Sequence, residues 1–418
     1  MIETEIKYKT HNISWLSEVP EHWKVIRIKN IFKEIDNRSI NGDEELLSVS
    51  QYTGVTPKRD SLENEDDFIS NAETLENYKK VAVGDLVINI MLAWNGSLGV
   101  STYDGITSPA YCVYRCLPPN NPEYFGCLFS TSLFKAEFRR NSTGIIDSRL
   151  RLYSDKFFSI FSFVPPAEEQ NKIVEHIKKQ SEKINRFIEA KKCFIKLLKE
   201  QRQSIIDYSI TEGKGEWISK KLKFIADLRF SNVDKHSIED EIPVRLCNYV
   251  DVYKNDYIIN NMELMLATAT EREIERFKIF KGDVIITKDS EEARDIAVPV
   301  FVSEDLENVI CGYHLGLIRV DETQILNEFL FRVFQSKKIR TYFEVRANGV
   351  TRVGLSMDDI SGVKIAFPKS LKEQQKIILY IKTETASIDT AISKAEREIE
   401  LIKEYKEAMI AEAVMGEI

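Results

Sequence analysis

Apolar residues recur at helical spacing over two long stretches of the chain. In the first stretch they occupy seven positions on one face: Ile173, Ile177, Ile184, Ile188, Ile195, Leu198 and Ile205. The positions 204 residues later are again all apolar: Ile377, Ile381, Ile388, Ile392, Ile399, Ile402 and Met409. Intervals of three, four and seven residues keep such a set on one helical stripe. Each stretch therefore predicts an amphipathic helix of roughly 40–45 residues, about 65 Å long.

The rest of the chain repeats at a similar interval. A short apolar strand after a Gly-Asp turn is predicted twice, in "VGDLVINI" (83–90) and in "KGDVIITK" (281–288). Between this strand and the long helix, residues 122–144 and 327–349 each predict one amphipathic helix that ends at a glycine. The chain is therefore two copies of one unit.

Each copy is predicted to be a mixed α/β domain of about 140 residues followed by a long helix. A helix with one apolar stripe gains most of its stability by burying it, so the two helices are expected to pair. Internal two-fold symmetry makes the pair antiparallel, in the manner of a coiled coil, with one domain at each end. The predicted segments are a first α/β domain, a first long helix, a second α/β domain and a second long helix: residues 1–163, 164–212, 213–366 and 367–418.

Composition limits the class of protein. The 418 residues, 43% of them hydrophobic, suffice for two or three packed domains. A formal charge of −8 argues weakly against nucleic acid, although a basic face can coexist with acidic surface elsewhere. The six cysteines form no CxxC pair and the five histidines have no ligand spacing, so neither a metal nor another cofactor is expected. Without an apolar leader or a stretch of 18 apolar residues, the chain is expected to be cytoplasmic and not to contact a membrane.

Three segments resemble one known family. They are "WLSEVPEHWKVIRIKNIF" (15–32), "PPAEEQNKIVEHI" (165–177) and "PKSLKEQQKIILYI" (368–381). With the two-copy layout, they are similar to the specificity subunits of type I restriction–modification enzymes over essentially the whole chain. The resemblance implies a non-catalytic protein whose two target-recognition domains each read one half of a bipartite, asymmetric double-stranded DNA site. It also implies that the helices dock two methyltransferase subunits, to which restriction–translocase subunits add.

Two motifs offer a catalytic alternative. "NNPEY" (120–124) partly matches the loop with which amino-methyltransferases grip a flipped base, but Glu123 replaces the second proline. Asp283 and Lys288 have the composition of a nuclease pair, but the first copy lacks the lysine. The sequence has no GxxxxGK[ST] phosphate loop. A helix-preceding turn and an ordinary strand are the simpler interpretations, so we expect a protein that reads DNA and does not catalyse.

Basic side chains for phosphates and amide or planar side chains for base edges indicate where DNA is bound. The strongest candidates are arginines around a glycine turn in each copy: Arg139, Arg140, Arg149 and Arg151 in the first, Arg346 and Arg352 in the second. Others follow predicted strands: Gln51, Tyr52, Lys58, Arg59, Trp94, Asn95, Asn248, Tyr249, Lys254, Lys288 and Arg294. Exposed arginines and aromatic residues at a domain rim are also ordinary surface features. A two-headed scaffold that binds proteins is therefore the alternative function, and a self-sufficient modification enzyme is disfavoured by the missing motifs.

Overall fold

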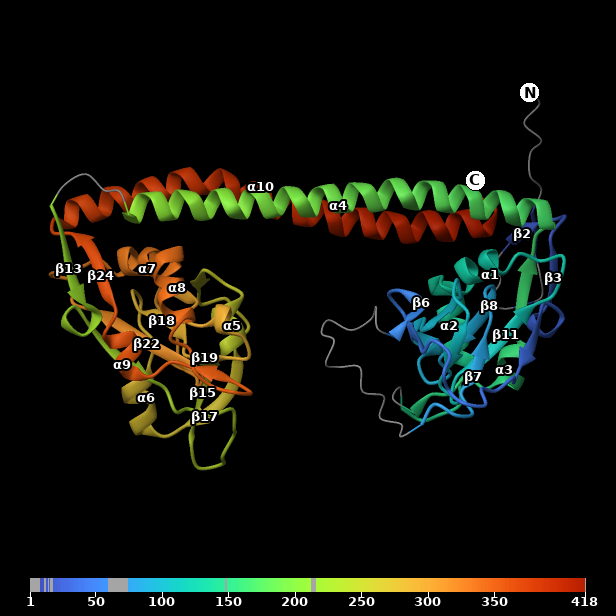
Figure 1. Ribbon diagram of the computed structural model, residues 1–418, viewed down its shortest axis with the longest axis horizontal. Helices are drawn as coiled ribbons and strands as arrows, with labels where there is room; N and C mark the ends of the chain where they lie inside the picture. The colour runs from blue at the N-terminus through green and yellow to red at the C-terminus, as the bar shows by residue number, and fades with distance from the viewer. Residues whose placement is uncertain are drawn as a thin grey trace, which may run out of the picture. The chain divides into compact units, whose positions relative to one another are not determined.

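The structure is a computed structural model in which two compact units can be described. The first unit comprises residues 1–190 and 398–418, and the second comprises residues 191–397. We call the α/β part of the first unit, from β1 to β12, the first head, and that of the second unit, from β13 to β24, the second head (Figure 1). The described residues are 8–10, 13, 15, 18–58, 74–146, 149–211 and 216–417.

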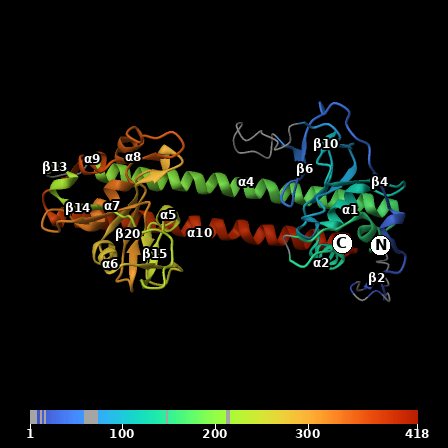
Figure 2. The same ribbon diagram turned by 90° about the horizontal axis from the view of Figure 1, so that it is seen from below.

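Two long helices of 45 residues each, α4 (Ala167–Thr211) and α10 (Leu371–Met415), contribute to both units. In the first unit the beginning of α4 packs against the end of α10, where Ile173 shares a core with Met409. In the second unit the end of α4 packs against the beginning of α10, where Ile206 shares a core with Ile381. Each unit therefore pairs the two helices in the antiparallel direction, which confirms the predicted fold class (Figure 2).

The residues of the predicted stripe are all at least partly buried. The buried ones are Ile173, Ile177, Ile184, Ile188, Ile195, Ile381, Ile388, Ile392 and Met409. The half-buried ones are Leu198, Ile205, Ile377, Ile399 and Ile402. Where the helices meet the second head, Ile206 and Ile378 are buried as well, each one position after a half-buried predicted residue. A straight α-helix drifts relative to a seven-residue repeat, so its buried face moves along the stripe.

The first head is built on an antiparallel sheet in the order β4-β11-β8-β9. All four residues of β8 are buried, as expected for the strand after the first Gly-Asp turn. The strands are β1 (Tyr8–Thr10), β2 (Glu18–Pro20), β3 (Lys24–Arg27), β4 (Phe32–Ile35), β5 (Leu47–Ser50), β6 (Gly54–Pro57), β7 (Lys79–Val81), β8 (Asp85–Ile88), β9 (Leu98–Val100), β10 (Gly105–Thr107), β11 (Cys112–Cys116) and β12 (Phe161–Val164). The helices are η1 (Ile28–Asn30), η4 (Ala93–Asn95), α1 (Pro122–Phe129), α2 (Ser132–Asn141) and α3 (Ser154–Ser159).

The second head repeats this order in β14-β22-β18-β20 and adds β16 at the edge, with α7 packed near β20 (Figure 2). The strands are β13 (Trp217–Lys221), β14 (Ala226–Phe230), β15 (Ile242–Cys247), β16 (Tyr257–Ile258), β17 (Met265–Ala269), β18 (Val284–Thr287), β19 (Asp289–Ser290), β20 (Pro299–Val302), β21 (Val309–Cys311), β22 (Leu315–Val320), β23 (Val353–Gly354) and β24 (Lys364–Pro368). The helices are η6 (Leu222–Phe224), α5 (Tyr249–Tyr253), α6 (Glu271–Phe277), η7 (Ala293–Asp295), α7 (Asn327–Gln335), α8 (Lys337–Glu344) and α9 (Met357–Ser361). Each head thus has its own central sheet, and the strand order is the same in both.

The single amphipathic helix predicted over 122–144, and again over 327–349, is wrong, because each stretch forms two helices. Between α1 and α2, the Thr131 hydroxyl donates a 2.7 Å hydrogen bond to the carbonyl of Leu128 and caps the second helix. Between α7 and α8, the Ser336 hydroxyl donates to a carbonyl of α7 at 2.6 Å. Such hydroxyl bonds compete with the helical backbone. Apolar periodicity does not reveal the break, because both short helices turn apolar faces to the core.

The same ion pair braces the central strands of both heads. Asp85 at the start of β8 accepts two 2.8 Å hydrogen bonds from Arg115 of β11. Asp283, which directly precedes β18, accepts bonds of 2.8 and 2.7 Å from Arg319 of β22. Both carboxylates are buried, and each pair is bidentate, the strongest geometry for such contacts. The Gly-Asp motif therefore recurs because its aspartate locks two strands together.

A buried glutamine attaches each long helix to its head. Gln170 donates a 2.9 Å bond to the carbonyl of Pro165 and accepts a 2.7 Å bond from the amide of Asn121, just before α1. Gln374 donates 2.8 Å to the carbonyl of the last residue of β24 and accepts 2.8 Å from the amide just before α7. The repeated Glu-Gln phrase at the helix starts is thus a structural joint among a strand end, a long helix and a short helix.

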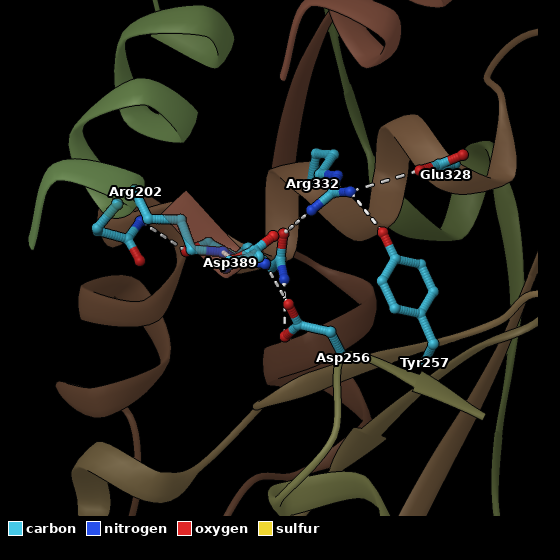
Figure 3. A network of polar contacts seen from close by, with 8 residues as sticks. Arg202, Asp256, Tyr257, Glu328, Arg332 and Asp389 are labelled. Atoms are coloured by element: carbon cyan, nitrogen blue, oxygen red, sulfur yellow. Dashed lines mark hydrogen bonds and ion pairs between the residues drawn. The ribbon is translucent and has the colours of Figure 1, made fainter. Parts of the chain in front are cut away.

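A polar network links the second head to the parts of both long helices in its unit (Figure 3). Arg202 of α4 bonds Asp389 of α10 at 2.7 Å and also pairs with Asp256, just before β16. Burial alone would lower the pKa of Arg202, but the two carboxylates raise it overall. Arg332 of α7 is buried and donates a 2.7 Å bond to the hydroxyl of Tyr257. Charged groups therefore hold this junction together.

Candidate nucleic-acid interface

A glycine turn lies beside the end of the central strand in each head. In the first head the amide of Leu152 donates a 2.9 Å bond to the carbonyl of Ile90, two residues after β8. In the second head the amide of Leu355 donates a 3.0 Å bond to the carbonyl of Lys288, directly after β18. The two heads therefore present the predicted arginine turn at the same place, tied by the same backbone bond.

The first turn is closed by an antiparallel bridge between Thr143 and Arg151, with both backbone bonds at 2.9 Å. Gly144 has a φ of 152°, and a Cβ there would lie 2.5 Å from the carbonyl oxygen of Arg149, so this position requires glycine. Arg149 is exposed, whereas Arg151 is half-buried and donates a 2.8 Å bond to the carbonyl of Leu150. The turn brings the two predicted arginines close together.

The second turn repeats this geometry between Asn348 and Gly354, with backbone bonds of 2.9 and 3.1 Å. Gly349 also has a φ of 152°, and a Cβ there would lie 1.9 Å from the carbonyl oxygen of Arg352. Arg346, at the other side of this turn, places its guanidinium 3.7 Å from the centre of the Tyr342 ring. Both predicted arginines of the second copy therefore flank its turn.

Near the first turn, the aromatic side chain of Trp94 packs against one of the predicted arginines. Trp94 of η4 donates its ring N–H to the carbonyl of Met91 at 3.1 Å, and the guanidinium of Arg139 lies 5.4 Å from its ring centre. Asn95 follows in the same short helix and is half-buried. Arg140 bonds Glu137 one turn earlier on α2 at 2.7 Å, and this bond raises the pKa of the arginine. Trp94, Asn95 and Arg139 thus lie where α2 packs on η4.

A charged cluster at the second turn escapes sequence analysis. Asp289 lies 2.8 Å from Nε of Arg352 and 2.7 Å from Nδ1 of His314, so one carboxylate holds two basic side chains. Lys288 is half-buried, and its ammonium lies 4.4 Å from the ring centre of Tyr313. Burial lowers the pKa of Lys288. The lysine is a packed residue, and the aspartate that follows it is the organising group.

Other predicted residues of the second head divide between structural and exposed positions. Asn248 caps α5 in a reciprocal capping box with Asp251. Tyr249 contacts the hydroxyl of Ser290 at 3.0 Å, and burial is the main reason that its pKa is raised. Lys254 ends α5 and is exposed. Arg294 of η7 is exposed and pairs with Glu292, and that contact raises the pKa of Arg294.

The remaining candidates of the first head surround one hairpin. Gln51 and Tyr52 form the tip between β5 and β6, where Tyr52 is 87% exposed. Lys58 directly follows β6, and its amide bonds the carbonyl of Leu46 at 2.8 Å. Arg59 lies outside the described residues. The ring of an aromatic residue at a hairpin tip is largely exposed to solvent in the free protein, so it is available for contact with a partner.

The residues of the two motifs that resemble catalytic ones, "NNPEY" (120–124) and the pair Asp283 and Lys288, have structural partners. Asn121 caps α1 and bonds Asn171, and Glu123 pairs with Lys178 of α4 at 2.5 Å. Asp283 is committed to Arg319, and Lys288 packs on an aromatic ring. These contacts account for both motifs without a catalytic role. None of the helices in the described ranges combines the length and the apolar character needed to pass through a bilayer.

Three comparisons relate the chain to known proteins. Residues 216–401 match the family model for the type I restriction modification DNA specificity domain. The chain is 23% identical to the type I restriction enzyme MjaVIII specificity subunit of Methanocaldococcus jannaschii, over 98% of this chain and 97% of that protein. It shares its fold with a chain of the solved structure described as "Structural basis underlying complex assembly and conformational transition of the type I R-M system", with a TM-score of 0.68 and 13% identity over 96% of this chain and 100% of that one. In both sequence comparisons the chain is therefore similar to the specificity subunits of type I restriction–modification systems, the components that carry DNA specificity.

Proposed function

We propose that each head of this specificity subunit binds one half of a bipartite, asymmetric double-stranded DNA site. In this proposal residues 1–163 and 213–366 are the recognition domains, and residues 164–212 and 367–418 are the spacer. The observation that carries it is the glycine turn, which has the same backbone geometry and the same bond to the central strand in both heads. A duplicated surface with basic residues in both copies suits a ligand that repeats along its length, as the DNA backbone does.

Differences between the turns support an asymmetric site. After its glycine the first turn carries Arg149 and Arg151, whereas the second carries only Arg352. Arg352 is held by Asp289, so its guanidinium is oriented before any ligand arrives. An oriented guanidinium suits bidentate contact with a phosphate or with a guanine edge. Two heads with different side chains on one frame would read two different half-sites.

The test replaces Arg149 and Arg151 together with alanine and measures DNA binding over a range of salt concentrations. Each lost phosphate contact should lower the slope of log K against log salt by about 0.9. The matched control replaces Lys29 of η1 and Lys33 of β4, two exposed lysines of the same head on elements that do not form the turn. Binding should be measured on the complex with its methyltransferases. An unchanged slope in a folded Arg149→Ala/Arg151→Ala variant would remove the turn from the interface.

The same proposal includes two methyltransferase subunits, one for each copy of the helix, with restriction–translocase subunits joining through that complex. Leu197 of α4 and Leu401 of α10 occupy equivalent positions 204 residues apart and are 57% and 47% exposed. Each has an exposed aromatic residue one helical turn away, Phe194 before Leu197 and Tyr405 after Leu401. Exposed leucines at equivalent positions, each beside an exposed aromatic residue, suit identical partners.

Native mass spectrometry of the co-expressed proteins tests this stoichiometry. The unmodified chain should bind two methyltransferase subunits. Leu197→Arg and Leu401→Arg should each leave one bound subunit, because each charge blocks one patch, and the double variant should bind none. Leu379→Arg, an exposed position whose counterpart is the acidic Glu175, is the control. A 1:1 complex of the unmodified chain under excess partner would contradict the proposal.

A further inference from the structure

An exposed apolar side chain directly follows the glycine of each turn. Ile145 is 100% exposed and Val350 is 103% exposed, so neither contacts the protein that carries it. They follow Gly144 and Gly349, which occupy the same position in the repeated turn. The first turn adds a second apolar side chain, Ile146, which is also exposed.

The backbone beneath these side chains is constrained. Each turn is closed by a bridge of two backbone bonds, and each glycine adopts a φ of 152° with no room for a Cβ. The chain leaving each turn is bonded to the end of the central strand through Leu152 or Leu355. Isoleucine and valine are branched at Cβ, which restricts rotation about χ1. Each apolar side chain therefore follows a glycine at the base of a turn that backbone bonds close.

Cationic groups flank each tip. In the first head Arg149 is exposed on the same turn. In the second head Arg352 stands two residues after Val350 and is oriented by Asp289 at 2.8 Å, and Arg346 is exposed before the turn. An apolar tip between guanidinium groups has the polarity of a base-pair step between its two phosphates. A purely apolar protein groove would desolvate these arginines and offer them no acceptor in return.

We propose that Ile145 and Val350 are wedges, each of which enters the base stack of the half-site bound by its own head while neighbouring arginines hold the phosphates. The inference rests on the proposed DNA-binding function and adds the mode of contact. DNA-deforming proteins insert isoleucine, leucine or phenylalanine between base steps and partly unstack them. Pyrimidine–purine steps deform most easily, so each half-site should contain such a step at the wedge. The larger Ile145 should unstack its step more than Val350 does.

The experiment uses the full chain with its two methyltransferases and a DNA duplex that carries the site found by methylome sequencing. Permanganate, which oxidises unstacked thymines, reports the wedge, and a binding titration reports affinity. Ile145→Ala should remove the reactive step from the first half-site only, and Val350→Ala from the second only. Each should weaken specific binding roughly tenfold. Ile145→Leu should keep both properties, because a leucine also wedges.

The controls are Val83→Ala in the first head and Val345→Ala in the second, both exposed apolar residues outside the turns. They should match the unmodified chain. Reactivity at the base that a methyltransferase flips, or opposite that base, should persist in every variant, which separates it from the wedge signal.

Three results are decisive. Specific binding by the unmodified complex, with Ile145→Ala and Val350→Ala unchanged in footprint and affinity, overturns the wedge and leaves DNA reading intact. Loss of methyltransferase subunits from these variants in native mass spectrometry overturns it in favour of a protein contact. Failure of the unmodified complex to discriminate its site from unrelated DNA overturns the proposed function itself.

Discussion

The two units make the same contact between α4 and α10 with different chemistry. In the second unit Arg202 of α4 donates a 2.7 Å hydrogen bond to Asp389 of α10. At the equivalent positions of the first unit, Lys406 of α10 donates a 3.0 Å bond to Asn185 of α4. One contact is an ion pair and the other joins a charge to a neutral amide. Duplication has preserved the geometry of the bond, whereas the charge of the acceptor has changed.

A second difference lies where each head meets its helices. Both heads keep a lysine–glutamate pair, Lys178 with Glu123 at 2.5 Å and Lys382 with Glu328 at 2.7 Å. In the second head Glu328 also faces the buried Arg332, whose counterpart in the first head is Cys127. The second junction is therefore held by a charged network. A buried charge stabilises only while its partners are present, so this junction should be the more sensitive to single substitutions.

The first junction relies on aromatic packing and one buried hydroxyl. Tyr124 of α1 donates a 2.9 Å bond to the carbonyl of Val414 of α10, and both residues are buried. The counterpart of Tyr124 is Phe329, which has no hydroxyl. Phe129 of α1 contacts Phe125, Phe134 and other rings in the same core. Two means of attachment thus serve one fold.

The largest expected effect comes from breaking the charged network. Arg332→Ala should lower the free energy of unfolding by about 3 kcal/mol, because it empties a buried site and removes a partner from the half-buried Tyr257 and Glu328. Chemical denaturation followed by circular dichroism measures this change. Cys127→Ala, at the equivalent position, is the control and should cost about 1 kcal/mol. Equal losses in the two variants would show that the networks do not differ.

Converting one helix contact into the other should have an intermediate effect. Arg202→Lys with Asp389→Asn gives the second unit the residues of the first and should cost about 1.5 kcal/mol, since a charge-assisted bond becomes a weaker one. The reciprocal Asn185→Asp should gain a few tenths of a kcal/mol, because that site is exposed. Thermal melts of the three chains make the comparison. A stabilising exchange at Arg202 would mean that burial of the charges outweighs their attraction.

Removing the buried hydroxyl should have the smallest effect. Tyr124→Phe makes the first head resemble the second and should cost about 1 kcal/mol, because the carbonyl of Val414 loses its donor. Phe329→Tyr, the reverse exchange, places a hydroxyl in a fully buried position that was shaped for a phenyl ring, so it should bring no gain. Denaturant midpoints measured in parallel test the pair, and a gain for Phe329→Tyr would contradict this explanation.

The sequence predicts the features that depend on periodicity and repetition. The stripe from Ile173 onward predicts both long helices and their pairing, and the repeated Gly-Asp phrase marks the central strand of each head. The break at Thr131 does not follow from the sequence, because a hydroxyl bond to a carbonyl three residues earlier leaves the apolar pattern intact. The role of Asp289 does not follow either, because its partners, His314 and Arg352, are distant in sequence and meet only through the fold.

The candidate site is predictable in outline for the same reason. The arginine turns follow from a glycine with arginines on both sides, a local signal that both copies share. Whether an individual side chain is free to contact DNA does not follow from the residues next to it in the sequence. Asn248 is a helix cap, and Lys288 is packed on Tyr313, although both resembled DNA contacts in the sequence. Tertiary partners therefore decide between a structural and a binding role for each polar residue.

The central claim is that the two heads read separate half-sites. Methylome sequencing of cells that express the chain with its methyltransferases, compared with cells that lack the chain, tests it most directly. We predict a chain-dependent methylated motif made of two short blocks that differ in sequence and are separated by a fixed number of unread base pairs. A single uninterrupted motif, or a methylome that is the same with and without the chain, would contradict the account.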